Sequence, residues 1–109
     1  MSKVKINGKD YTVPELTFRH LPMMEKCGLT LKDMTSSRYI FTTVEVFTAI
    51  VCECEIEQAD YLLEQHILGG GNVLTIYDAF MDAMKDSGFF RTLLERGKKK
   101  EALAEKKNN

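Results

Sequence analysis

The sequence lacks any long apolar run, and this absence excludes one broad class of protein. Hydrophobic residues make up 44% of the chain, yet no stretch approaches the roughly 20 consecutive apolar residues that span a bilayer. Residues 1–6 also have no apolar core of the kind found in a signal peptide. We therefore expect a protein that stays in the cytoplasm of the cell that makes it and has no membrane partner.

A strong charge of one sign is missing as well. Fifteen Lys and Arg residues face 16 Asp and Glu residues, which gives a net charge of -1. Because general nucleic-acid binders are normally basic, we expect no nucleic-acid partner. Cysteine is scarce: Cys27, Cys52 and Cys54 are an odd number without a CxxC spacing. This pattern argues against a disulfide framework and favours a reducing compartment.

Residues 3–13 have the pattern of a β-hairpin. Apolar and polar residues alternate in 4–6 and again in 11–13. Asn7-Gly8 lies between these runs, and both residues tolerate the positive φ that a type I′ turn requires. Pro14 then ends the pairing, because it has no N–H to donate. A two-stranded hairpin is marginal alone, so we expect it to pack on the rest of the chain.

The pattern after the hairpin predicts a mainly α fold, a small bundle of four to six helices. The first helix is expected to start near Pro22 and to end at Gly28, with a short turn capped by Thr30 after it. The next, over Val44 to Cys54, is apolar nearly all round and is expected to be central and buried. Its β-branched residues leave a buried strand as the competing interpretation.

Local signals also mark the ends of the later helices. The spacing of Thr42 and Glu45 matches a capping box and favours a helical start there. The helix after it, with its apolar face from Ile56 to Ile67, is expected to stop at residues 69–71, which are all glycine. Asn72 is expected to cap the following helix, which Gly88 would break.

Charge divides the chain into one domain and a tail. Residues 1–95 are predicted to form a single helical domain, with nine basic and fourteen acidic side chains and a net charge of -5. Residues 96–109 carry six basic and two acidic side chains, a net of +4, and are predicted to be a basic flexible tail.

Candidate catalytic and metal sites fail on geometry or on composition. Two residues of a helix that are two apart point about 200° away from each other, so Cys52 and Cys54 are not expected to share an ion. No local signature supports a nucleophilic pair of either thiol with His20 or His66. Glycines 69–71 lack the Gly-Lys-Ser/Thr ending of a P-loop. We therefore expect no enzyme, no catalytic residue, no cofactor and no metal.

Partner binding is the functional class that the residues favour. Acidic side chains crowd neighbouring turns without a basic residue among them, and two adjacent phenylalanines follow later in the chain. The candidate partner-binding residues are Glu53, Glu55, Glu57, Asp60, Glu64, Phe89 and Phe90. Such an acidic face repels itself and could steer a basic partner. The alternative is a merely solvating surface.

The order of these features resembles a known family. It opens on Val4-Lys5-Ile6-Asn7-Gly8-Lys9-Asp10-Tyr11-Thr12-Val13-Pro14-Glu15-Leu16-Thr17-Phe18. An apolar central helix follows, then Gly69-Gly70-Gly71-Asn72, then Asp86-Ser87-Gly88-Phe89-Phe90 and a Lys-rich end. Over roughly residues 3–95, this arrangement is similar to the tail assembly chaperones of long-tailed bacteriophages and prophages of Gram-positive hosts.

The resemblance implies a non-catalytic, mostly helical protein. Members of this family bind the tape-measure protein, prevent its aggregation, help to recruit tail-tube protein, and are absent from the mature virion. The competing hypothesis is a phage structural adaptor, such as a head–tail joining or tail-completion protein. We also expect a homo-oligomer, because few other helices are available to cover the central one. Many members are also made in a longer, frameshifted form, and residues 97–100 are a plausible place for ribosomes to slip.

Overall fold

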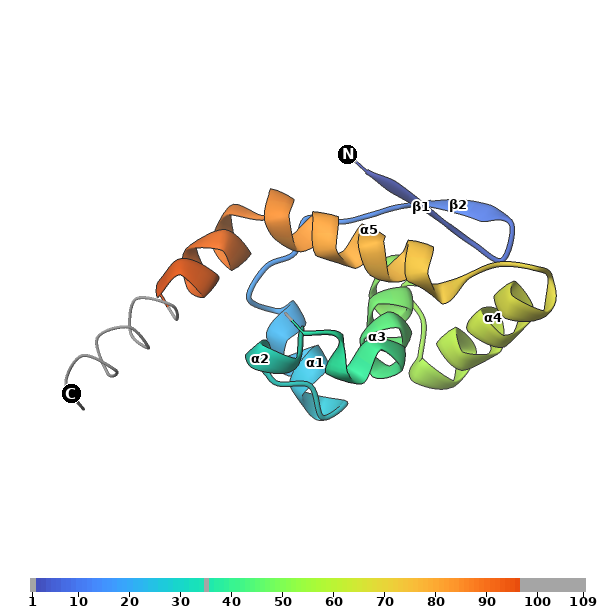
Figure 1. Ribbon diagram of the computed structural model, residues 1–109, viewed down its shortest axis with the longest axis horizontal. Coiled ribbons are helices and arrows are strands. Elements are labelled where there is room, and N and C mark those ends of the chain that lie inside the picture. Colours follow the sequence, from blue (N-terminus) through green and yellow to red (C-terminus); the bar gives the residue numbers. More distant parts are fainter. Residues whose placement is uncertain (1, 35, 97–109) are drawn as a thin grey trace.

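A computed structural model describes residues 2–34 and 36–96. These residues form a mainly helical fold with one two-stranded antiparallel sheet, as the sequence predicts. Figure 1 shows α3 (Ile40–Cys52) at the centre, α5 (Val73–Asp86) across it, and α4 (Ile56–Leu68) to one side. Helices α1 (His20–Lys26) and α2 (Leu31–Met34) lie on the other side. The predicted tail and slippage point, from residue 97 onward, lie outside the described residues.

The hairpin is confirmed with the predicted turn. Strands β1 (Lys3–Ile6) and β2 (Lys9–Thr12) are antiparallel, and Ile6 pairs with Lys9. Asn7 has φ 52° and Gly8 has φ 79°, the positive values of a type I′ turn. Val4 and Ile6 are buried, and β1 contacts both α4 and α5. Packing on helices therefore stabilises a hairpin that would be marginal alone.

The central position of α3 is confirmed, and so is its helical form. Its buried side chains run from Thr43 to Val51 with the exception of Glu45. Other elements of the same copy cover these side chains, since α3 contacts α1, α4, α5 and β2. The argument that a second copy is needed to cover the central helix is therefore wrong.

The predicted ends of α3 are also wrong. The helix begins at Ile40, after the 3-10 turn η1 (Ser37–Tyr39), so Thr42 lies inside it and does not cap it. It ends at Cys52, because Glu53 adopts a left-handed conformation with φ 52° and ψ 50°. Cys54 therefore lies outside the helix. The capping-box pair therefore lies inside the helix, and the carboxyl group of Glu45 has a partner on α4.

Other helix ends follow their local signals. The Oγ1 atom of Thr30 accepts a hydrogen bond from the N–H of Asp33 at 3.2 Å and so caps α2. Oδ1 of Asn72 accepts from the N–H of Leu74 at 2.8 Å and caps α5. Helix α1 starts at His20, two residues before Pro22, which lies in the first turn where no N–H is needed.

The break after α5 lies at Ser87, not at Gly88. Ser87 is extended and fully buried, and its hydroxyl donates to the carbonyl of Leu16 at 2.6 Å. The same oxygen accepts from the N–H of Phe90 at 3.2 Å, which caps a helix over residues 88–96. A contact with a distant segment thus ends one helix and starts the next.

Candidate functional site

The candidate surface is built on α4, which follows α3 after a three-residue connection. The left-handed backbone of Glu53 turns the chain, and the N–H of Cys54 donates to the carbonyl of Ala49 at 3.1 Å. This local geometry ends α3 in the manner of a left-handed C-cap. Helix α4 then begins at Ile56 and packs on α3. One face of α4 therefore packs against α3, and the opposite face is exposed.

The inward face of α4 is anchored at its last turn by His66. Nδ1 of His66 accepts from the N–H of Asn7 in the hairpin turn at 2.9 Å. Its proton therefore belongs on Nε2, which lies 3.3 Å from the carbonyl oxygen of Asn72 and donates to it. A Cβ atom at Gly71 would overlap the imidazole ring. His66 thus joins the hairpin, α4 and the start of α5, a role that sequence reasoning missed.

The outward face of α4 alternates acidic and large apolar side chains. Glu57 and Glu64 lie two turns apart, as do Tyr61 and Leu68, so helical periodicity places all four on one stripe with Asp60 at its edge. All five are exposed: Tyr61 is 57% and Leu68 is 72% accessible. We call these five residues the α4 outer face.

The structure places the seven predicted partner-binding residues in different environments. Glu57, Asp60 and Glu64 share the α4 outer face, whereas Glu53 and Glu55 lie exposed in the connection before it. Phe90 is fully buried, so it is not available at the surface. Phe89 is half-buried and packs edge-on against Phe90, with ring centroids 5.3 Å apart.

Sequence reasoning missed the apolar half of the surface. Tyr61 and Leu68 on α4 are exposed, and so are Ile67 and Leu74 near the α4–α5 connection. Phe18 is 66% exposed and packs edge-on against Phe89 at 6.1 Å between centroids. The seven-residue spacing of Tyr61 and Leu68 was the available signal, because it places both residues on the polar side of the helix.

The inner edge of the α4 outer face holds a carboxyl pair. Glu45 on α3 and Asp60 on α4 share a hydrogen bond, which is the largest cause raising the pKa of Glu45 to about 7. Partial burial and repulsion between the two carboxylates raise it further. Near neutral pH, Glu45 is therefore partly protonated, and a proton joins the two helices at this point.

Burial dominates the pKa shifts of the thiols and of the remaining histidine, although Tyr11 and Lys9 act to lower the pKa of Cys52. Burial is the largest cause raising the pKa of the thiols of Cys27, Cys52 and Cys54, and this reduces the thiolate fraction at neutral pH. Burial, aided by the charge of Arg19, lowers the pKa of His20. Its Nδ1 accepts from the N–H of Thr17 at 2.9 Å.

Metal binding has little support in the described part of the chain. Within it, no group of three or more His, Cys, Asp or Glu side chains is arranged to hold a metal ion. The sequence argument about Cys52 and Cys54 assumed that both lie on one helix, and that premise is wrong. Two thiols remain fewer than the four ligands of a structural zinc site.

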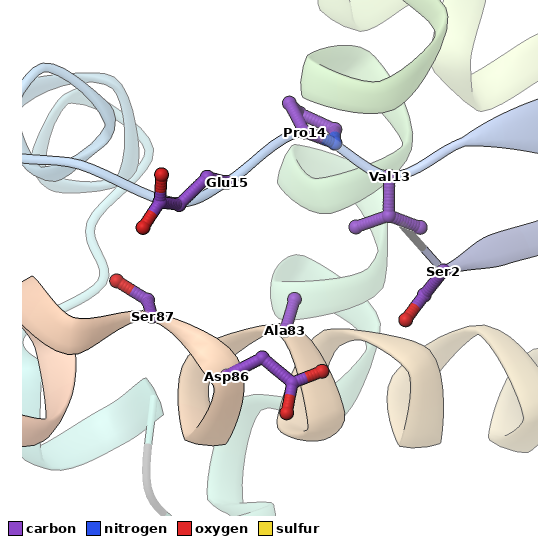
Figure 2. Close-up of a pocket in the computed structure, with 7 residues that line it drawn as sticks. All are labelled: Ser2, Val13, Pro14, Glu15, Ala83, Asp86 and Ser87. Atoms are coloured by element: carbon purple, nitrogen blue, oxygen red, sulfur yellow. The ribbon is translucent and has the colours of Figure 1, made fainter.

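A broad depression of about 720 Å³ lies between the linker after β2 and the last turns of α5. Figure 2 shows its lining residues, with Val13, Pro14 and Glu15 on the linker and Ala83 and Asp86 on α5. Ser87 also lines it, but its hydroxyl already bonds to Leu16. The lining combines two exposed carboxylates with small apolar groups and does not form an acid–base or nucleophilic pair.

Comparisons with protein-family models, with curated proteins and with solved structures found no match. In the described residues, no helix combines the length and apolar character needed to cross a bilayer.

Proposed function

We propose that this protein is a non-catalytic phage tail assembly chaperone that binds the tape-measure protein and assists tail-tube assembly. The observation that carries the proposal is the α4 outer face, which exposes Tyr61 between Glu57 and Glu64, and Leu68 one turn after Glu64, on a helix whose other side is firmly packed. The family resemblance of residues 3–95 supports the same class of function.

The chemistry of the surface suits a helical client. A tape-measure protein is long and helical and exposes apolar stripes until tail-tube protein covers them. Apolar side chains on α4 provide contacts for such a stripe, in the manner of helix-in-groove recognition. The acidic side chains beside them keep the face hydrated and favour clients with basic residues next to the stripe.

The variant that tests the proposal reverses two charges on α4. A tagged chain is co-expressed with the tape-measure protein encoded beside it, and the captured tape-measure protein is quantified. We expect Glu57→Lys/Glu64→Lys to reduce capture at least tenfold, because two attractions become repulsions at the centre of the contact. The matched control is Asp78→Lys/Asp82→Lys, the same charge change on exposed positions of α5. Equal capture by all three proteins would contradict the proposal.

The structural-adaptor hypothesis makes a different prediction for purified particles. An assembly chaperone leaves before the tail is complete, whereas an adaptor remains in it. We expect mass spectrometry of purified virions to find no stoichiometric amount of this chain. A fixed copy number per virion would favour the head–tail joining or tail-completion role. Gene order offers a further check, because a chaperone gene is expected between the genes for the major tail protein and the tape-measure protein.

A further inference from the structure

We propose that the α4 outer face also binds the basic C-terminal segment, residues 96–109, of a second copy of this chain. This inference goes beyond the tape-measure interaction and does not depend on it. It states which surface of one copy binds which segment of the next, and therefore in which direction the copies associate. Three observations carry it: the charge of the face, the composition of the segment, and the position of the helix over residues 88–96, which lies at the opposite end of the described fold from α4.

The face carries negative charge that no basic residue of its own helix dilutes. Helix α4 contains no Lys or Arg, and residues 39–84 contain none either. Glu57, Asp60 and Glu64 therefore lie together on one exposed side. Like charges on neighbouring turns destabilise a helix, so a basic occupant would relieve a repulsion that exists in the single copy.

Residues 96–109 have the complementary composition. They carry six basic and two acidic side chains. Leu103 lies between the basic runs 98–100 and 106–107, with Glu101 and Glu105 two residues away on either side. On the α4 outer face, Tyr61 lies between Glu57 and Glu64, and Leu68 follows one turn after Glu64. Apolar contact and charge pairing are thus available at the same time.

The polarity of the contact follows from the fold. Figure 1 shows the helix over residues 88–96, which leads into the basic segment, at the end of the molecule opposite α4. A segment that leaves at one end is best placed to meet the α4 outer face of a neighbour. Such a contact is heterologous, because each copy uses two different surfaces. Copies joined in this way form chains or closed rings, and salt weakens the contact.

Two charge-reversed variants of the full chain test the inference. The face variant is Glu57→Lys/Glu64→Lys, the segment variant is Lys98→Glu/Lys99→Glu/Lys100→Glu, and the control is Asp78→Lys/Asp82→Lys. Sedimentation velocity is measured for each over a concentration series at low and high salt, and circular dichroism checks that each variant is folded. We expect concentration-dependent association of the natural chain and the control. Each of the two test variants should associate at least tenfold more weakly.

Mixing the two test variants provides the decisive result. Their heterodimer can form through one natural contact, the basic segment of the face variant on the acidic face of the segment variant. In a second contact, the acidic segment of the segment variant can meet the basic face of the face variant. We therefore expect the mixture to recover association. A monomeric natural chain at high micromolar concentration, an unchanged face variant, or a mixture that stays monomeric would each overturn the inference. Concentration-independent compaction would mean that the segment binds its own copy, and that would overturn it too.

Discussion

At the scale of single residues, two titratable groups tie the stability of the fold to pH in opposite directions. Glu45 shares a hydrogen bond with Asp60 between α3 and α4, and its pKa is raised to about 7. His20 is buried under the linker, and its pKa is lowered. Protonation of Glu45 therefore stabilises the fold, whereas protonation of His20 destabilises it. Neither role was predictable from the sequence, because each depends on a neighbour that only the fold supplies.

The carboxyl pair predicts that Glu45→Gln stabilises the protein above pH 7. Its folded pKa lies above the ordinary value of 4.5, so the stability from the proton is complete below about pH 4.5 and is lost as the pH rises through 7. Glutamine keeps a hydrogen-bond donor at every pH. Because Glu45 is only partly buried, we expect a gain of only about 1 kcal/mol at pH 8 in urea unfolding. A variant less stable than the natural chain at pH 8 would contradict this assignment.

Because His20 is buried, we expect the protein to lose stability as the pH falls. Because the pKa of His20 is lower in the fold than the ordinary 6.5, its stabilising effect is complete above pH 6.5 and declines as the pH falls. We expect His20→Asn, whose amide oxygen can accept from the N–H of Thr17, to flatten this decline. Thermal unfolding from pH 7.5 to 5 measures it, ideally in a Glu45→Gln background that removes the opposing effect. An unchanged slope would mean that His20 is not the group responsible.

At the scale of elements, most local signals were reliable, whereas the capping-box spacing of Thr42 and Glu45 was not. Asn7-Gly8, Thr30 and Asn72 act within four residues of themselves, and the sequence predicted all three. The start of α3 and the break at Ser87 depend on partners far along the chain, and both predictions were wrong. On the candidate surface, helical periodicity grouped the acidic residues of α4 correctly. It did not reveal that Phe90 is buried by distant elements.

The junction of the hairpin, α4 and α5 gives a prediction at this scale. We expect Gly71→Ala to destabilise the protein by about 1–3 kcal/mol, because the new methyl group would displace the ring of His66 from Asn7 and Asn72. The control is Gly88→Ala, a position with open space and ordinary φ. Chemical denaturation compares the two variants. Equal effects would show that the His66 contact does not hold the junction together.

At the scale of the whole molecule, the fold separates a packed interior from a charged exterior. Most side chains of helix α3 are buried by the elements around it, although Phe41 in its first turn is exposed, and α4 is left with one outward side. That side carries negative charge and apolar groups, while residues 96–109 carry a net charge of +4. A molecule organised in this way is suited to bind other chains. The proposed chaperone function rests on this arrangement.

The central claim is that this protein keeps a tape-measure protein soluble. The most direct measurement is the fraction of the tape-measure protein in the soluble lysate after expression alone, with this chain, and with the Glu57→Lys/Glu64→Lys variant. We predict mostly insoluble tape-measure protein alone, a several-fold larger soluble fraction with the natural chain, and little gain with the variant. A soluble fraction that is the same with and without the natural chain would contradict the account.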